Sequence, residues 1–316
     1  MKNDKKMKGQ IMKEYKFTDS KIYKLNEKLK KKPFKYIYKE LLPNFLFDKI
    51  QREVYFSNQK AIINDWNKVL TDYFENKIEI AKVIPKKKFL NDEKIIWQFW
   101  GQGWDYEKLP NVVKICYKAM DKYKENYTLI RLDMKNIGEY LEFPDYVMKK
   151  LAEKKMGYAH FTDIIRLALL NYYGGVWLDA TVILTDYLPQ EYFNMDYFVY
   201  QRDDFFNEKE KWEKIDSIYF SWDKRNKVRF LSSIIFSKRG NKIIGTLLDM
   251  LIIFWNYNDK IPNYFFFQIL YTQLIEKYYK KEQCIVVSDT LPHELFIKLF
   301  EKYDEEEYNN IKNKIN

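Results

Sequence analysis

The spacing of hydrophobic residues divides the chain into two regions. In residues 41–83, apolar residues recur every three or four positions, which places them on one face of a helix. Pro85 and the three lysines after it are typical of a linker. From Lys94 onward, short apolar runs alternate with longer segments of helical spacing. We therefore predict a mainly helical N-terminal region over residues 1–88 and a separate folded domain over residues 89–316.

The second region has the pattern of a domain in which strands and helices alternate. Gly174 and Gly175 follow a strongly apolar segment, as expected where a helix ends. The predicted strands cover residues 95–100, 127–132, 176–178, 198–201, 232–236 and 285–287, and the predicted helices cover 110–124, 140–154, 158–173, 242–255 and 264–279. This alternation indicates an α/β fold with a mixed, mostly parallel sheet. Ligands of such folds bind at the carboxyl ends of the strands.

The composition restricts the chemistry that this domain can carry. The chain has 316 residues, of which 47% are hydrophobic, enough for a sizeable buried core. Its two cysteines and two histidines exclude a disulfide framework and a Cys/His zinc site, which needs about four such ligands. Any metal ion must therefore be held by oxygen ligands.

The N-terminal region carries nearly all of the net charge. Residues 1–40 contain 14 Lys and 5 Asp or Glu, whereas the rest of the chain has 41 basic and 40 acidic residues. Such a basic arm can be solvated, lie on an anionic membrane surface or contact nucleic acid. The remaining chain has no basic stripe that would form a nucleic-acid groove, so we expect no nucleic-acid partner.

The sequence also suggests a location. No apolar run reaches the roughly 18–20 residues that span a bilayer. The first residues lack the apolar segment of a secretory signal. We expect a cytoplasmic protein, attached peripherally to the inner face of the membrane if the basic arm binds lipid.

Three charged residues stand out in the second region. Asp163 and Arg166 lie three positions apart in an otherwise apolar predicted helix, so they share one face. They form either a structural ion pair or a polar corner that binds the hydroxyl or phosphate groups of a ligand. Asp179 follows the buried strand at 176–178, so it either caps the next turn or faces a diphosphate or metal ion at the edge of the sheet.

These residues belong to a segment that resembles a known family. AHFTDIIRLALLNYYGGVWLDAT, residues 159–181, is similar to the donor-site block of glycosyltransferase family thirty-two, and in particular of bacterial capsular polysaccharide synthesis proteins. The same 16-residue step between the two aspartates occurs in the large clostridial glucosylating toxins. KIIWQFWGQGWDYEKLP, residues 94–110, resembles the first-strand block of these proteins.

The resemblance implies a fold, an activity and roles for individual residues. The fold would be a GT-A-type, Rossmann-like domain, and the activity that of a retaining glycosyltransferase with a nucleotide-sugar donor, most commonly a UDP-sugar. Trp100 would stack on the nucleotide base, and Asp163 and Arg166 would hold the transferred sugar. Asp179 corresponds to the first aspartate of the Asp-x-Asp motif, which binds the nucleotide and a divalent metal ion, Mn²⁺ or Mg²⁺.

One position departs from the family pattern. Thr181 stands where the second aspartate of the motif would supply a direct metal contact. Because a hydroxyl is a weaker ligand for hard cations than a carboxylate, we expect a weak metal site at Asp179 and Thr181. The expected acceptor is a capsular or other surface polysaccharide or its lipid-linked precursor. The alternative is a catalytically weak protein that binds a nucleotide sugar or glycan.

Other candidate residues have weaker support in the sequence. Lys238 and Arg239 could stabilise a leaving phosphate, although a solvated turn over residues 238–241 accounts for them equally well. His160 is expected to begin a helix rather than to act as a base, and His293 is assigned to the surface or the core.

Overall fold

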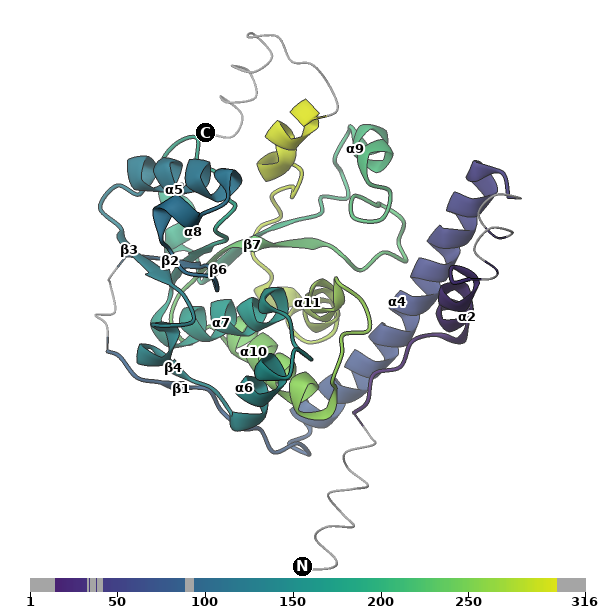
Figure 1. Cartoon of the computed structure of the whole chain (residues 1–316), viewed down its shortest axis with the longest axis horizontal. Helices are drawn as coiled ribbons and strands as arrows, with labels where there is room; N and C mark the ends of the chain where they lie inside the picture. The colour runs from purple at the N-terminus through teal and green to yellow at the C-terminus, as the bar shows by residue number, and fades with distance from the viewer. Residues whose placement is uncertain (1–14, 33, 35–37, 39–41, 89–93, 300–316) are drawn as a thin grey trace, which may run out of the picture.

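The computed structural model describes residues 15–32, 34, 38, 42–88 and 94–299. The basic segment 1–14 and the last residues, 300–316, lie outside the described part of the chain. Figure 1 shows a central sheet with helices on both faces and a long helix, α4, along one side of the molecule.

The central sheet has five strands in the order β3-β2-β5-β7-β6. Their bounds are Thr128–Leu132, Ile95–Phe99, Gly175–Leu178, Phe230–Ser237 and Tyr197–Gln201 in that order. β2 pairs in parallel with β3 and with β5, whereas β7 is antiparallel to both of its neighbours. The prediction of a mixed sheet is confirmed, and β7 alone runs against the other four strands. Because β7 lies between two of them, two of the four pairs are antiparallel, more than a mostly parallel sheet implies.

Helices cover both faces of this sheet. The described helices are α2 (Lys21–Leu29), α4 (Asn44–Phe74), α5 (Asn111–Tyr123), α6 (Asp145–Ala152), α7 (Tyr158–Tyr173), α8 (Gln190–Asn194), α9 (Lys209–Ile215), α10 (Lys242–Tyr257) and α11 (Phe266–Lys277). Successive residues of β2 alternate between two hydrophobic clusters. Trp97 packs in the larger one, with residues of α7, α10 and α11, and Ile96 packs in the smaller one, with Met120 of α5. All five residues of β2 are buried as a result.

Most predicted elements are confirmed, and the helix predicted at 158–173 matches α7 at both ends. The helix predicted at 140–154 begins only at Asp145, because Leu141–Glu142 form strand β4 and Pro144 disfavours a helical residue before it. β4 pairs with β1, Ile84–Pro85, inside the segment predicted as a linker. The strand predicted at 285–287 is not formed, because only the last residue of β6 bonds to this segment, through the Gln201 amide and the Val287 carbonyl.

The N-terminal region packs closely on the second region. Trp66 of α4 is fully buried, its indole N–H donates to the Phe266 carbonyl of α11 at 3.0 Å, and its ring lies 6.1 Å from the Phe266 ring. Residues of α4 and of the sheet therefore share one hydrophobic core. The domain boundary between residues 88 and 89, next to the undescribed residues 89–93, stays a prediction.

Two further observations concern the whole chain. Cys116 and Cys284 are both free thiols. In the described part of the chain, none of the helices combines the length and the apolar character that crossing a bilayer requires.

Candidate active site

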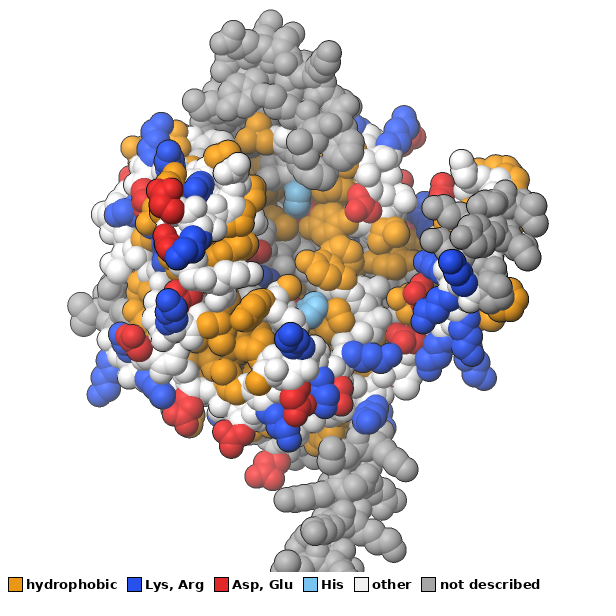
Figure 2. Space-filling view, in the orientation of Figure 1, with side chains coloured by type: hydrophobic (Ala, Val, Ile, Leu, Met, Phe, Trp, Pro, Cys, Tyr) orange, Lys and Arg blue, Asp and Glu red, His pale blue; other side chains and the backbone are white. Residues whose placement is uncertain are grey.

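A polar cavity of about 270 Å³ opens where β2 and β5 end. It is bounded by the start of α7, the start of β7 and the start of α11. Figure 2 shows the face of the molecule on which the helices around α5 and those around α11 enclose a hollow. The side chains that line the cavity include those of Phe99, Trp100, Gln102, Tyr158, His160, Thr162, Asp163, Arg166, Asp179, Thr181, Ser232, Tyr264 and Gln268. The cavity thus lies at the carboxyl ends of parallel strands, where ligands of such folds bind.

The geometry of α7 and β5 explains why residues 16 positions apart meet in this cavity. From Asp163 the chain runs about 15 Å along α7 to its end, at 1.5 Å per residue. It then returns about 13 Å along β5 to Asp179, at about 3.3 Å per residue. The reversal depends on Gly175, whose φ is +101° and whose Cβ, if it had one, would lie 2.5 Å from the Ile95 carbonyl oxygen. Only glycine fits this tight connection.

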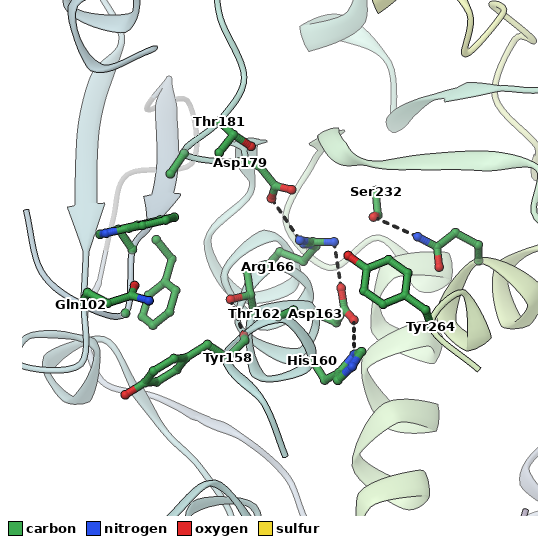
Figure 3. A pocket seen from close by; sticks show the side chains of 16 residues that line it. Gln102, Tyr158, His160, Thr162, Asp163, Arg166, Asp179, Thr181, Ser232 and Tyr264 are labelled. Carbon is green, nitrogen blue, oxygen red and sulfur yellow. Dashed lines mark hydrogen bonds and ion pairs between the residues drawn. The ribbon is translucent and has the colours of Figure 1, made fainter. Parts of the chain in front are cut away.

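Arg166 joins the two aspartates in one network (Figure 3). Its Nη1 donates to Asp163 Oδ1 at 2.8 Å, and its Nη2 donates to Asp179 Oδ1 at 3.0 Å. Trp177 of β5 also donates to Asp179 Oδ1, at 2.6 Å. The Arg166 side chain is 6% exposed, whereas that of Asp179 is 29% exposed. Asp163 and Arg166 therefore form an ion pair and also line the cavity. The two interpretations, a structural ion pair and a polar corner that faces a ligand, are thus compatible.

Three buried polar atoms of this cavity have no hydrogen-bond partner among the described residues. They are Arg166 Nε, His160 Nδ1 and Gln268 Oε1. His160 Nδ1 lies 3.7 Å from Asp163 Oδ2, too far for a hydrogen bond, and the Gln268 amide instead donates to Ser232 Oγ at 3.2 Å. Buried polar groups are normally satisfied, so the side chains that carry these atoms are incompletely hydrogen-bonded. The three atoms have almost no accessible surface in this structure, so they could pair with the hydroxyl groups of a ligand only after a side chain moves.

The cavity offers few ligands for a divalent cation. Asp179 Oδ1 already accepts two hydrogen bonds, and no hydrogen bond from a described residue reaches its Oδ2. Thr181 lines the same cavity. No three His, Cys, Asp or Glu side chains within the described ranges are grouped closely enough to hold a metal ion. Asp179 Oδ2 and Thr181 therefore fit a cation that receives most of its oxygens from a bound ligand.

Comparison with known proteins identifies the family. The sequence pattern of the family described as "Capsular polysaccharide synthesis protein" matches residues 43–316. The chain belongs to this family. It is also 25% identical over 192 residues to the O-glycosyltransferase braB of Annulohypoxylon truncatum, and the match covers 56% of this chain and 41% of that protein. Among solved structures, it is similar to the PaToxG glycosyltransferase, with a TM-score of 0.38, 14% identity and coverage of 81% and 93% of the two chains.

In this capsular polysaccharide synthesis protein, the end of β2 forms the wall opposite Ser232 and Tyr264 (Figure 3). Trp100 is half-buried, and its backbone N–H donates to the Leu132 carbonyl at 2.9 Å, which fixes the residue at the edge of the sheet. A Cβ on Gly101 would lie 3.1 Å from the Tyr158 ring, so the backbone packs directly on that ring. Trp100 thus lines the same cavity as the aspartates, and its stacking on a nucleotide base stays a prediction.

Three other candidates lie away from the cavity. Residues 238 and 239 follow the last residue of β7, Ser237, which pairs with Gly175 at the start of β5. Asp179 follows the other end of β5, so these two residues lie at the opposite end of the strands from Asp179. There Lys238 forms an ion pair of 3.1 Å with Asp196, which agrees with the expected turn rather than with a phosphate site. His293 is also remote: its ring packs on Tyr219 and Phe220, and burial lowers its pKa.

Several residues of the cavity were not predicted from the sequence. His160, assigned only to the start of a helix, lines the cavity next to Asp163. Its spacing of three residues from Asp163 could have revealed this, because both lie on the same face of α7. Ser232, Tyr264 and Gln268 come from β7 and the start of α11, and no local sequence pattern marks them.

Proposed function

We propose that this chain is a retaining glycosyltransferase of the GT-A type that transfers a sugar from a UDP-sugar to a polysaccharide acceptor. The acceptor would be a capsular or other surface polysaccharide, or its lipid-linked precursor. Membership of the capsular polysaccharide synthesis family and the name of the braB relative support this class of reaction. The observation that carries the proposal is the Asp163–Arg166–Asp179 network in a cavity that has unpartnered polar atoms.

The arrangement of charges matches what glycosyl transfer requires. The bond from the anomeric carbon to the diphosphate oxygen breaks, a bond to the acceptor hydroxyl oxygen forms, and that hydroxyl loses its proton. Positive charge develops on the sugar and negative charge on the leaving diphosphate in the transition state. Asp163 would accept hydrogen bonds from sugar hydroxyls, and Arg166 would lie between the sugar and the diphosphate. Trp100 would stack on the base.

A divalent cation would complete the diphosphate site. Asp179 Oδ2 and Thr181 would hold it together with phosphate oxygens, and it would neutralise the charge of the leaving group. The Arg166 guanidinium already lies 3.0 Å from Asp179 Oδ1, so it competes electrostatically with a cation at this carboxylate. We therefore expect Mn²⁺ or Mg²⁺ to bind together with the donor rather than alone.

One observation favours the alternative, a protein that binds a nucleotide sugar or glycan with little catalysis. Thr181 leaves Asp179 as the sole carboxylate of the motif, and Arg166 already neutralises part of its charge. Release of free sugar from UDP-glucose, UDP-galactose or UDP-N-acetylglucosamine in the presence of Mn²⁺ separates the two functions. A transferase releases sugar slowly without acceptor, whereas a binding protein is stabilised by the donor but releases none.

A pair of arginine variants tests whether the network is catalytic. Arg166→Ala should lower the turnover of folded protein about 100-fold or more, because a charge-assisted contact to the developing charge is lost. Arg202→Ala is the matched control, since Arg202 forms a fully buried ion pair of 2.8 Å with Asp289 and does not line the cavity. It should lower stability but not turnover per folded molecule. If both substitutions changed the turnover per folded molecule equally, the Asp163–Arg166 pair would have only a structural role.

A further inference from the structure

The hairpin formed by α2 and the first part of α4 exposes an unusual amount of apolar surface. We call the described residues 21–32, 34, 38 and 42–52 the hairpin tip. Among the residues that the structure describes, 17 large hydrophobic residues are exposed, and six of them lie in this short segment: Ile22, Leu25, Phe34, Phe45, Leu46 and Ile50. Phe45 is 69% exposed. Such a concentration of exposed apolar side chains is typical of an interaction surface.

The most deeply buried residue of α2 is polar, and two of its apolar residues are exposed. The buried residue of α2 is Asn26, which exchanges hydrogen bonds of 3.1 Å with Gln51 of α4 and accepts one of 2.7 Å from Tyr38. These three side chains form a polar contact between the two helices, whereas Ile22 and Leu25 of α2 face outward. Apolar side chains that point away from a polar interior fit an environment less polar than water.

The body of the protein does not cover this surface. The buried residues of α4 begin at Val54, so no described residue before that point is buried in the helix. Figure 1 shows the first half of α4 standing away from the sheet with α2 beside it. The family pattern begins at residue 43, so α2 lies before the matched region.

The charge of the hairpin tip indicates which partner it fits. Its described residues include Lys21, Lys24, Lys28, Lys30, Lys31, Lys32 and Lys49, against the acidic residues Glu27 and Asp48. Arg52, at the end of the tip, instead pairs with Asp223 of the body at 3.7 Å. Figure 2 shows blue side chains gathered over α2 and the adjoining part of α4. A second copy of the chain would bring the same positive charge and be repelled. Nucleic acid would match the charge but leave the apolar side chains in water.

We infer that the hairpin tip docks on an anionic lipid surface. Its apolar side chains enter the interfacial layer, and its lysines lie against the lipid phosphates. The basic composition of residues 1–40 accounts only for attraction by charge. The structure adds the apolar contact and extends the surface into α4. Docking of this kind does not depend on the proposed transferase activity.

Vesicle sedimentation of the full chain tests this inference. Phosphatidylcholine vesicles with about 30% phosphatidylglycerol should bind the protein, and vesicles of phosphatidylcholine alone should bind it much more weakly. The triple variant Ile22→Ser, Leu25→Ser and Phe45→Ser should bind at least about tenfold more weakly at both low and high salt, because it lacks the apolar contact. Circular dichroism should show unchanged helix content.

A matched control changes three exposed apolar residues elsewhere. Val112→Ser, Ile115→Ser and Phe205→Ser remove side chains of similar exposure outside the tip and should leave vesicle binding unchanged. The inference is overturned if the wild type does not bind anionic vesicles, or if the tip and control variants bind these vesicles equally well. It is also overturned if light scattering shows a dimer that only the tip substitutions dissociate, since the occupant would then be a second copy.

Discussion

At the residue scale, substitution of Trp100 tests the proposed recognition of the nucleotide base. If its ring stacks on the base, Trp100→Ala should weaken the binding of UDP by about 1–3 kcal/mol, as measured by titration calorimetry. Trp104→Ala is the control, because Trp104 also bonds to the Leu132 carbonyl, at 2.8 Å, but does not line the cavity. Unchanged UDP affinity in Trp100→Ala would remove this residue from the site.

The proposed metal site at Asp179 and Thr181 gives a second prediction at the same scale. Because Asp179 Oδ1 is shared by Arg166 and Trp177, Mn²⁺ affinity without nucleotide should be poor. Asp179→Ala should abolish the mutually dependent binding of metal and donor. Thr181→Asp should shift the activity optimum to lower Mn²⁺ concentration, and Thr181→Val should shift it higher, because the two changes add a carboxylate and remove a hydroxyl.

The measurement is activity against Mn²⁺ concentration for the wild type and the three variants. Full wild-type activity in a strong chelator would contradict the metal requirement. The leaving diphosphate would then be stabilised by side chains such as that of Arg166.

At the scale of single elements, the connection between α7 and β5 controls the site. Gly175→Ala should lower the free energy of unfolding by about 3 kcal/mol, since φ is +101° and the added Cβ would lie 2.5 Å from the Ile95 carbonyl oxygen. Gly138→Ala is the control: its Cβ would meet no atom within 4 Å, and its φ is not positive. Urea unfolding should show a change within about 0.5 kcal/mol for that variant. A similar small effect at Gly175 would show that the connection tolerates a side chain.

At the scale of the whole molecule, the N-terminal helices and the sheet share a core. Trp66→Ala should therefore lower the free energy of unfolding by about 3–5 kcal/mol and do so in a single transition. The control is Phe45→Ala, which changes an exposed residue of the same helix and should have little effect. A separate early transition in Trp66→Ala, detected by thermal unfolding, would instead indicate an independent N-terminal domain that ends near residue 88.

The sequence by itself determined the local elements and the centre of the site. Periodicity placed α7 and β2, because amphipathic spacing and buried runs depend on neighbours along the chain. The convergence of Asp163, Arg166 and Asp179 also follows locally, since a helix, a two-glycine turn and a short strand return the chain over a fixed distance. The family resemblance rests on the same segment, and the match over residues 43–316 confirms its capsular polysaccharide synthesis part, whereas membership of glycosyltransferase family thirty-two stays a prediction.

Only the tertiary structure decided which distant segments complete the cavity. Gln268 and Ser232 line the same cavity as Arg166 because α11 packs on the reversed strand β7 and β7 pairs with β5, and such contacts depend on pairing between segments far apart in sequence. The reversal of β7 was not predictable, since a strand has the same apolar pattern in either direction. The position of Lys238 at the far end of the strands follows from that reversal. The outward-facing Ile22 and Leu25 also needed the structure, because an apolar position on a helix is expected to face the core unless packing places a polar residue there.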